Sequence, residues 1–292
     1  MLQLVQVLMS GVSQGCIYGL IAIGFVLIYK ATETVNFAQG ELMMLGAFCG
    51  LICSRYFGLP YWLSLLVAVA VLACFGFLIE RLALRPILGQ PVFAVVMVTI
   101  AIGYVARGLI TMIPDIGTDT HALAAPFKDQ VIRYGELVIG MEHVVIIITT
   151  MVLCGALFAL FRYTRIGIAM QAASQNQLAA YYMGIPVKRL NSLIWATSAA
   201  VAAVAGLLIA PITFVHVNMG FIGLKAFPAA VIGGFESLPG AVVGGLIIGI
   251  VESLAGFYLA EGFKDIAAYV VVLIMLMIKP HGLFGESIRK CV

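Results

Sequence analysis

The stretch of sequence that decides the fold is Thr34-Val35-Asn36-Phe37-Ala38-Gln39-Gly40-Glu41-Leu42-Met43-Met44-Leu45-Gly46-Ala47-Phe48. It places two amides and a carboxylate at the start of an apolar, glycine-rich run. It directly follows an apolar run, residues 4–29, that is long enough to cross a membrane. A polar break beside a membrane-spanning helix is unfavourable unless it faces protein or a water-filled path. We therefore expect residues 36–54 to form an interrupted helix beside a solute route.

The composition supports a membrane protein throughout. The chain has 292 residues, of which 63% are hydrophobic and only 10% are charged, whereas a soluble domain has about 25% charged residues. So few charges cannot cover a surface that faces water, so membrane lipid is the expected surroundings. The net charge of +3 comes from scattered Lys and Arg residues, which favours no nucleic-acid partner.

Further apolar runs follow along the chain, and together they predict an all-α, polytopic helical membrane protein. We expect about eight to nine spanning segments in a single transmembrane domain, residues 1–292. Two of the segments, 36–54 and 221–235, are short and interrupted by Gly or Pro, a pattern that points to the binding path of a transporter. The other runs are 61–79, 92–113, 143–161, 191–211, 240–258 and 265–279.

Charge placement orients the segments, because cytoplasmic loops are enriched in Lys and Arg. The loop 162–190 is basic and is expected inside. The loop 114–142 is mostly acidic and is expected outside. An odd number of crossings must then follow residue 212, so segment 221–235 has to cross as well, or another span must be broken. The charges behind this orientation are Arg81, Arg85, Arg162, Arg165, Lys188, Arg189, Lys279, Arg289 and Lys290 against Asp115, Asp119, Asp129, Glu136 and Glu142.

The polar residues of the first break allow two compatible interpretations. Asn36 can cap a helix that begins nearby, and Gln39 lies three residues on, where a capping-box partner reaches back. Glu41 then lies in the first turns, where the helix dipole favours a carboxylate. Alternatively, all three side chains line or brace the solute path.

A few ionisable side chains lie within apolar runs, where charges need partners or water. We expect Arg107 to reach the outer interface with its long side chain. Lys225 is expected to pair with Glu252, and Glu41 is the competing partner. Such pairs either hold helices together or contact the solute, and the second part of the path is expected around Lys225 and Phe227.

The loop 162–190 contains a candidate docking helix. Gln171 to Met183 is rich in Ala and Gln and lacks Pro and Gly, so it predicts a helix that ends at Gly184, with Pro186 following. A short surface helix of this kind docks into a groove of a soluble partner or lies on lipid. The Lys/Arg-rich polar face of a lipid-lying helix is absent, which favours docking.

No motif of an enzyme is present in the sequence. Walker A, GxSxG and HExxH motifs are absent, and the four histidines lack metal-ligand spacing. The six cysteines include no CxxC pair. We therefore expect no catalytic residue, cofactor or metal in this chain, and no ATP hydrolysis by it.

Several motifs together resemble the permease subunits of bacterial branched-chain amino acid ABC importers. The resemblance covers nearly the whole chain. The motifs are Asn36-Phe37-Ala38-Gln39-Gly40-Glu41; Glu80-Arg81 with Arg85-Pro86; Arg165, Gly167 and Ala169 with Ala172 and Gly184-Ile185; the glycine-rich stretch from Gly223-Leu224-Lys225-Ala226-Phe227 to Gly249; and Lys279-Pro280-His281-Gly282-Leu283-Phe284-Gly285.

The resemblance implies an importer made of several subunits in the bacterial inner membrane. A second, homologous permease would pair with this chain. Two cytoplasmic ATPases would bind ATP and Mg, and a periplasmic binding protein would deliver the solute. The loop 162–190 would couple to an ATPase through Arg165, Gly167, Gln171, Ala172, Ala180, Gly184 and Ile185. Gln171 departs from the family, whose members often carry Arg there.

Other functions remain open at this stage. The family also moves urea, amides and other small organic solutes, so the solute does not follow from the resemblance. A stand-alone secondary transporter or channel would explain the interrupted helices equally well. A membrane-embedded enzyme is disfavoured because no catalytic cluster is present.

Overall fold

The computed structural model describes residues 2–87, 89–134, 137–260 and 262–285. Over these residues the chain is helical, as expected, apart from one antiparallel hairpin of β1 (Val131–Tyr134) and β2 (Leu137–Gly140). The helices are α1 Leu2–Thr32, α2 Gln39–Phe57, α3 Tyr61–Ile79, η1 Glu80–Leu84, η2 Arg85–Ile87, α4 Val92–Thr111, α5 Met141–Tyr163, α6 Arg165–Gln175, α7 Gln177–Tyr182, α8 Val187–Thr213, η3 Val217–Met219, α9 Gly220–Gly233, α10 Leu238–Tyr258 and α11 Phe263–Ile278.

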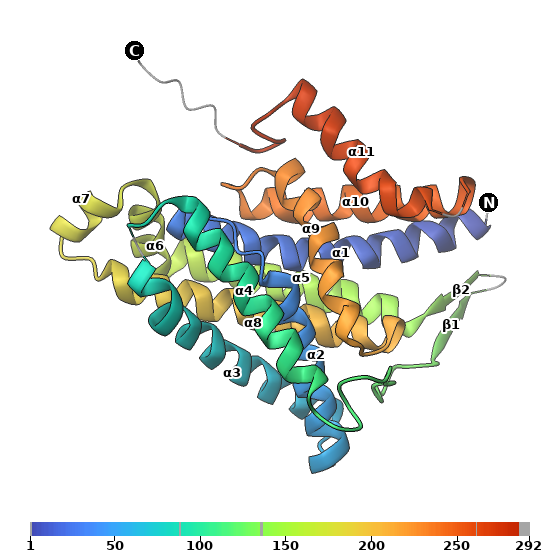
Figure 1. Ribbon diagram of the computed structural model, residues 1–292. Helices are drawn as coiled ribbons and strands as arrows, with labels where there is room; N and C mark the ends of the chain where they lie inside the picture. Colours follow the sequence, from blue (N-terminus) through green and yellow to red (C-terminus); the bar gives the residue numbers. More distant parts are fainter. Residues whose placement is uncertain (1, 88, 135–136, 261, 286–292) are drawn as a thin grey trace.

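The core forms around α1, which packs against α8, α9 and α10 (Figure 1). In the most apolar window of α1, 89% of the residues are buried, against 22% in α5 and 28% in α3 and α4. These outer helices expose large apolar side chains such as Leu66, Val105 and Met151. A buried central helix surrounded by helices with apolar outer faces is the arrangement of a bundle in lipid.

Small residues let α1 and α10 approach closely. Gly11, Gly15 and Gly19 recur every fourth residue along α1 and face Gly245 and Gly249 of α10. A Cβ on Gly15 would lie 2.8 Å from the Cα of Leu246, too close for an unchanged backbone. This small-residue interface is how helices gain packing energy in lipid, where the hydrophobic effect does not drive association.

Six helices of the described part are long and apolar enough to cross a membrane: α1, α3 with its extension to Ile87, α4, α5, α8 and α10. The polytopic helical fold is thereby confirmed. α9 is shorter, α11 has 16 residues, and α2 is less apolar. The number of eight to nine crossings stays a prediction. Glu136, Arg289 and Lys290, which the charge argument counts, lie outside the described residues.

The loop 114–142 is folded against the helices rather than extended. His121 forms an isolated bridge with Val215, and the ring of Phe127 lies 5.2 Å from that of Tyr61 on α3. The β-hairpin was not anticipated, because four residues in each strand are too few to show a clear alternating pattern. Figure 1 places this hairpin and the pair α6 and α7 at opposite ends of the bundle, which the charge-based orientation requires.

The orientation predicts opposite labelling of two neutral, exposed positions, Thr118 and Gln175. In a cysteine-free background, Thr118→Cys should react with an impermeant thiol reagent added to intact cells. Gln175→Cys should react only after the cells are permeabilised. Reaction of both positions in intact cells would overturn the topology.

Candidate functional site

The break between α1 and α2 lies in the packed interior. Asn36 and Gln39 are fully buried. Asn36 Nδ2 donates to Gln39 Oε1 at 3.3 Å, and Gln39 Nε2 donates to the carbonyl of Ser198, near the middle of α8, at 3.3 Å. Ser198 Oγ lies 3.0 Å from both Gln39 Oε1 and the carbonyl of Gly24. The amides therefore brace α2 against α1 and α8 in this conformation.

The capping interpretation of Asn36 is wrong in detail. α2 begins at Gln39 with Ala38 at the N-cap position and no side-chain cap. Asn36 Oδ1 instead accepts a hydrogen bond from the Ala38 amide at 3.0 Å. An Asn side chain commonly bonds the backbone two residues on, and this local turn ends the break before the helix starts. Glu41 does lie in the first turn.

The two short helices meet at their first turns. The backbone of Gly40 on α2 faces Gly220 and Gly223 on α9, and a side chain at any of the three positions would overlap its neighbour. The two segments, far apart in the sequence, are therefore in direct backbone contact. Each is a continuous helix that follows a break in the chain, rather than the interrupted helix that the sequence predicted. The sequence pattern identified both segments but gave no sign of this contact.

Glu41 pairs with Arg107, which corrects two expectations. Arg107 Nη2 donates to Glu41 Oε1 at 2.5 Å, and the guanidinium lies 4.4 Å from the ring centre of Phe221. Arg107 therefore does not extend to the interface, because its side chain turns to a carboxylate and is only 17% exposed. Glu41 is consequently not the partner of Lys225.

A cavity of about 210 Å³ lies beside this ion pair, between α2, α4 and α9. Three of its lining residues carry polar side chains: Glu41, Tyr104 and Arg107. The rest of its lining is apolar or backbone: Phe37, Ile100, Gly103, Gly220, Phe221 and Leu224. An apolar pocket with a few placed polar groups is the usual form of a small-molecule site.

Lys225 pairs with Glu252, as the sequence suggested. Lys225 Nζ lies 3.4 Å from Glu252 Oε1 and 2.5 Å from Asp265 Oδ1 on α11. Glu252 is 1% exposed and also accepts a hydrogen bond from Tyr18 at 2.5 Å. Lys225 therefore ties α9 to α10 and α11. The contribution of Asp265 was missed because it lies beyond the next loop in the sequence.

Phe227 belongs to an aromatic cluster between α1, the break and α9. Its ring centre lies 5.7 Å from that of Phe25, 5.8 Å from that of Phe37 and 5.7 Å from that of Phe235. It therefore packs the first break against the end of α9. Whether Phe227 or the polar residues contact a solute stays a prediction.

The segment 162–190 folds as two helices rather than one. α6 and α7 are separated at Asn176, whose extended backbone breaks the helix and whose side chain accepts from the Ala179 amide at 2.9 Å. The average helix propensity of the segment did not reveal this stop. Asn favours a cap over a helix interior, and this single residue divides the segment into two helices. Gly184 ends the segment with a φ of +81°, as expected.

The predicted coupling residues divide by exposure. Arg165, Gln171, Ala172 and Gly184 are exposed and Ile185 is partly buried, whereas Gly167 and Ala180 are buried within the chain. The tip of α7 exposes large side chains: Leu178 66%, Tyr181 67%, Tyr182 77% and Met183 83%. We call these four residues the α7 tip.

Comparison with known proteins decides the family. The model of the family described as "Branched-chain amino acid transport system / permease component" matches residues 7–279. The chain belongs to this family.

Two relatives and one solved structure show the range of similarity. The chain is 31% identical to the high-affinity branched-chain amino acid transport system permease protein LivH of Escherichia coli, over 98% of this chain and 96% of LivH. It is 29% identical to the fructose import permease protein FruF of Bifidobacterium longum, over 94% of this chain and 78% of FruF. PsaBC from Streptococcus pneumoniae has a similar fold, with a TM-score of 0.50 and 14% identity over 96% and 92% of the two chains.

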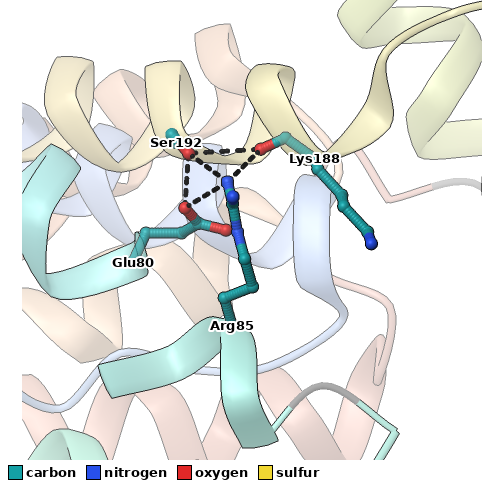
Figure 2. A network of polar contacts seen from close by, with 4 residues as sticks. All are labelled: Glu80, Arg85, Lys188 and Ser192. Carbon is teal, nitrogen blue, oxygen red and sulfur yellow. Dashed lines mark hydrogen bonds and ion pairs between the residues drawn. The ribbon is translucent and has the colours of Figure 1, made fainter. Parts of the chain in front are cut away.

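One permease motif, Glu80-Arg81 with Arg85-Pro86, builds a polar network at the end of α3 (Figure 2). Arg85 Nη2 lies 3.2 Å from Glu80 Oε2, 2.9 Å from Ser192 Oγ and 3.1 Å from the carbonyl of Lys188. The Ser192 hydroxyl also donates to Glu80, which is 2% exposed. The network joins α3 to the first turns of α8, directly after the α6 and α7 segment.

Removing Arg85 should destabilise the permease strongly. Arg85→Met leaves the buried Glu80 carboxylate without its cation, which costs about 3–5 kcal/mol for a buried pair. Arg81→Met is the matched control, because Arg81 is exposed one position after Glu80. In detergent, the melting temperature of the purified protein should fall for Arg85→Met and stay near the wild-type value for Arg81→Met. Arg85→Met combined with Glu80→Gln should recover part of the loss, and no recovery would argue against the pair.

Proposed function

We propose that this chain is one of two permease subunits of an ATP-driven importer for branched-chain or related hydrophobic amino acids, working by alternating access. The observation that carries the proposal is the contact of the first turns of α2 and α9 at Gly40 and Gly223, beside a small, mostly apolar cavity. In many transporters, helices that begin at a break within the bundle direct their first turns at the solute site. Family membership supports the same function.

The partners proposed for this subunit are a homologous permease, two cytoplasmic ATPases and a periplasmic solute-binding protein, in the bacterial inner membrane. ATP and Mg would be bound by the ATPases, not by this chain. The α7 tip supports docking, because four large exposed side chains on a short helix suit a groove on a soluble protein. The basic residues around α6 and α7 support a cytoplasmic position for this tip.

A different solute is the second candidate. The similarity to a protein named as a fructose import permease favours an importer of another small organic solute, such as a sugar, urea or an amide. The family alone does not separate these solutes.

Co-isolation tests the assembly. The tagged chain, expressed together with its candidate ATPase, permease and binding-protein partners, should co-purify with two ATPase subunits and a second permease. A stand-alone secondary transporter or channel would instead purify alone and move solute without ATP. The second result would contradict the proposal.

A further inference from the structure

The Glu41–Arg107 pair lies at the edge of the bundle rather than in its core. The Glu41 and Arg107 side chains are 15% and 17% exposed, and Phe221 and Tyr104 beside them are 48% and 68% exposed. Partly exposed charges on a face that touched lipid would be costly. This face of α4 and α9 must therefore meet water or another protein subunit.

The cavity beside the pair has the size of a free amino acid. Its volume of about 210 Å³ corresponds to about seven water molecules at roughly 30 Å³ each. A branched-chain amino acid of about nine non-hydrogen atoms fills such a space, which is below the range of about 300–1,000 Å³ that is usual for larger ligands. The cavity therefore selects a small solute.

We propose that this cavity binds the solute as a zwitterion, an inference that rests on the proposed function. The Arg107 guanidinium binds the solute carboxylate, and the Glu41 carboxylate binds the solute ammonium group. Phe37, Ile100 and Leu224 contact the apolar side chain. Arginine presents a planar fork of donors that matches a carboxylate, and Phe221 holds the guanidinium in place through its ring face.

The pair is suited to this exchange because a zwitterion brings one charge of each sign. Without solute, Glu41 and Arg107 neutralise each other at 2.5 Å. With the solute bound between them, Glu41 and Arg107 each pair with the opposite charge of the solute. No charge is therefore left unpaired in either state. A solute that lacks one of the two charges leaves Glu41 or Arg107 without a partner, which is costly. The site would therefore discriminate against such solutes.

The competing explanation is that the ion pair only holds α2 against α4. Neutralising both residues distinguishes this structural role from solute binding. The double variant Glu41→Gln with Arg107→Gln leaves no unpaired charge, so the assembly with the ATPases should survive. The initial rate of ATP-driven uptake of radiolabelled L-leucine into proteoliposomes should fall about tenfold or more, because two charge-assisted contacts are lost. Uptake at the wild-type rate would mean a structural tie only and would overturn the proposal.

A second variant tests the cavity and leaves both charges in place. It provides the test of the proposal should the double variant fail to assemble. Leu224→Trp fills the space beside the pair, and Leu109→Trp is the matched control on the exposed face of α4, away from the cavity. Leu224→Trp should reduce L-leucine uptake at least about tenfold and L-alanine uptake less, while Leu109→Trp reduces neither. Equal uptake by both variants would overturn the proposal.

Failure of the site and failure of the proposed function give different results. If the wild-type assembly imports L-leucine with ATP, but the double variant and Leu224→Trp import it at the wild-type rate, the zwitterion site is wrong and the proposed function stands. If the wild-type assembly imports no hydrophobic amino acid in an ATP-dependent way, the proposed function itself is wrong.

Discussion

Tyr182→Asp at the α7 tip should abolish ATP-driven uptake while the chain still inserts into the membrane. Tyr182 is 77% exposed, so the change leaves the packing of α6 and α7 intact. Large aromatic side chains at the centre of a docking surface often contribute more than about 2 kcal/mol, and a buried charge opposite an ATPase groove adds a desolvation cost. We expect uptake to fall more than tenfold.

The control for this change is Tyr258→Asp, an equally drastic substitution at a side chain that is 64% exposed at the other end of the bundle. It should assemble and transport normally. Ala180 is unsuitable for this test because it is buried within the segment, so a charge there would disrupt α7 itself. Normal uptake by Tyr182→Asp would remove the docking role from the α7 tip.

Lys225→Met should impair folding and assembly strongly, because it removes the cation from two carboxylates at once. Glu252 is 1% exposed and would keep only the hydrogen bond from Tyr18. Leaving one member of a buried pair costs about 3–5 kcal/mol. Lys128→Met in the outer loop is the matched control, and the melting temperature and assembly yield in detergent measure both.

Second-site changes identify which carboxylate matters. Lys225→Met with Glu252→Gln should recover much of the loss. Lys225→Met with Asp265→Asn should recover little, because the Asp265 side chain is 68% exposed and stays hydrated. Equal recovery with Asp265→Asn, or no recovery with Glu252→Gln, would contradict the conclusion that the unpaired Glu252 carboxylate destabilises Lys225→Met.

The sequence predicted the parts of this fold that depend on local composition. The apolar runs predicted the spanning helices, and the polar break at Asn36 and the glycines near Gly223 marked the starts of α2 and α9. The turn at Gly184 and the pairing of Lys225 with Glu252 also followed from residue type and position. Each of these features is visible within one segment or requires a partner for a buried charge.

What the sequence did not predict depends on how distant segments pack. The contact of Gly40 with Gly223 and the partner of Glu41 require the crossing of α2, α4 and α9, which no local pattern specifies. Arg107 was expected at the interface because only its position along α4 was visible. Asn176 was placed inside a helix because average propensity outweighed a single capping residue.

The most direct test of the central claim is uptake by the complete assembly in proteoliposomes. The chain is reconstituted with its partner permease and ATPases, loaded binding protein is added, and radiolabelled L-leucine is followed with and without ATP inside the vesicles. We predict accumulation against a gradient only with ATP, and none with a hydrolysis-defective ATPase. Equal leucine entry in the absence of ATP would contradict the account.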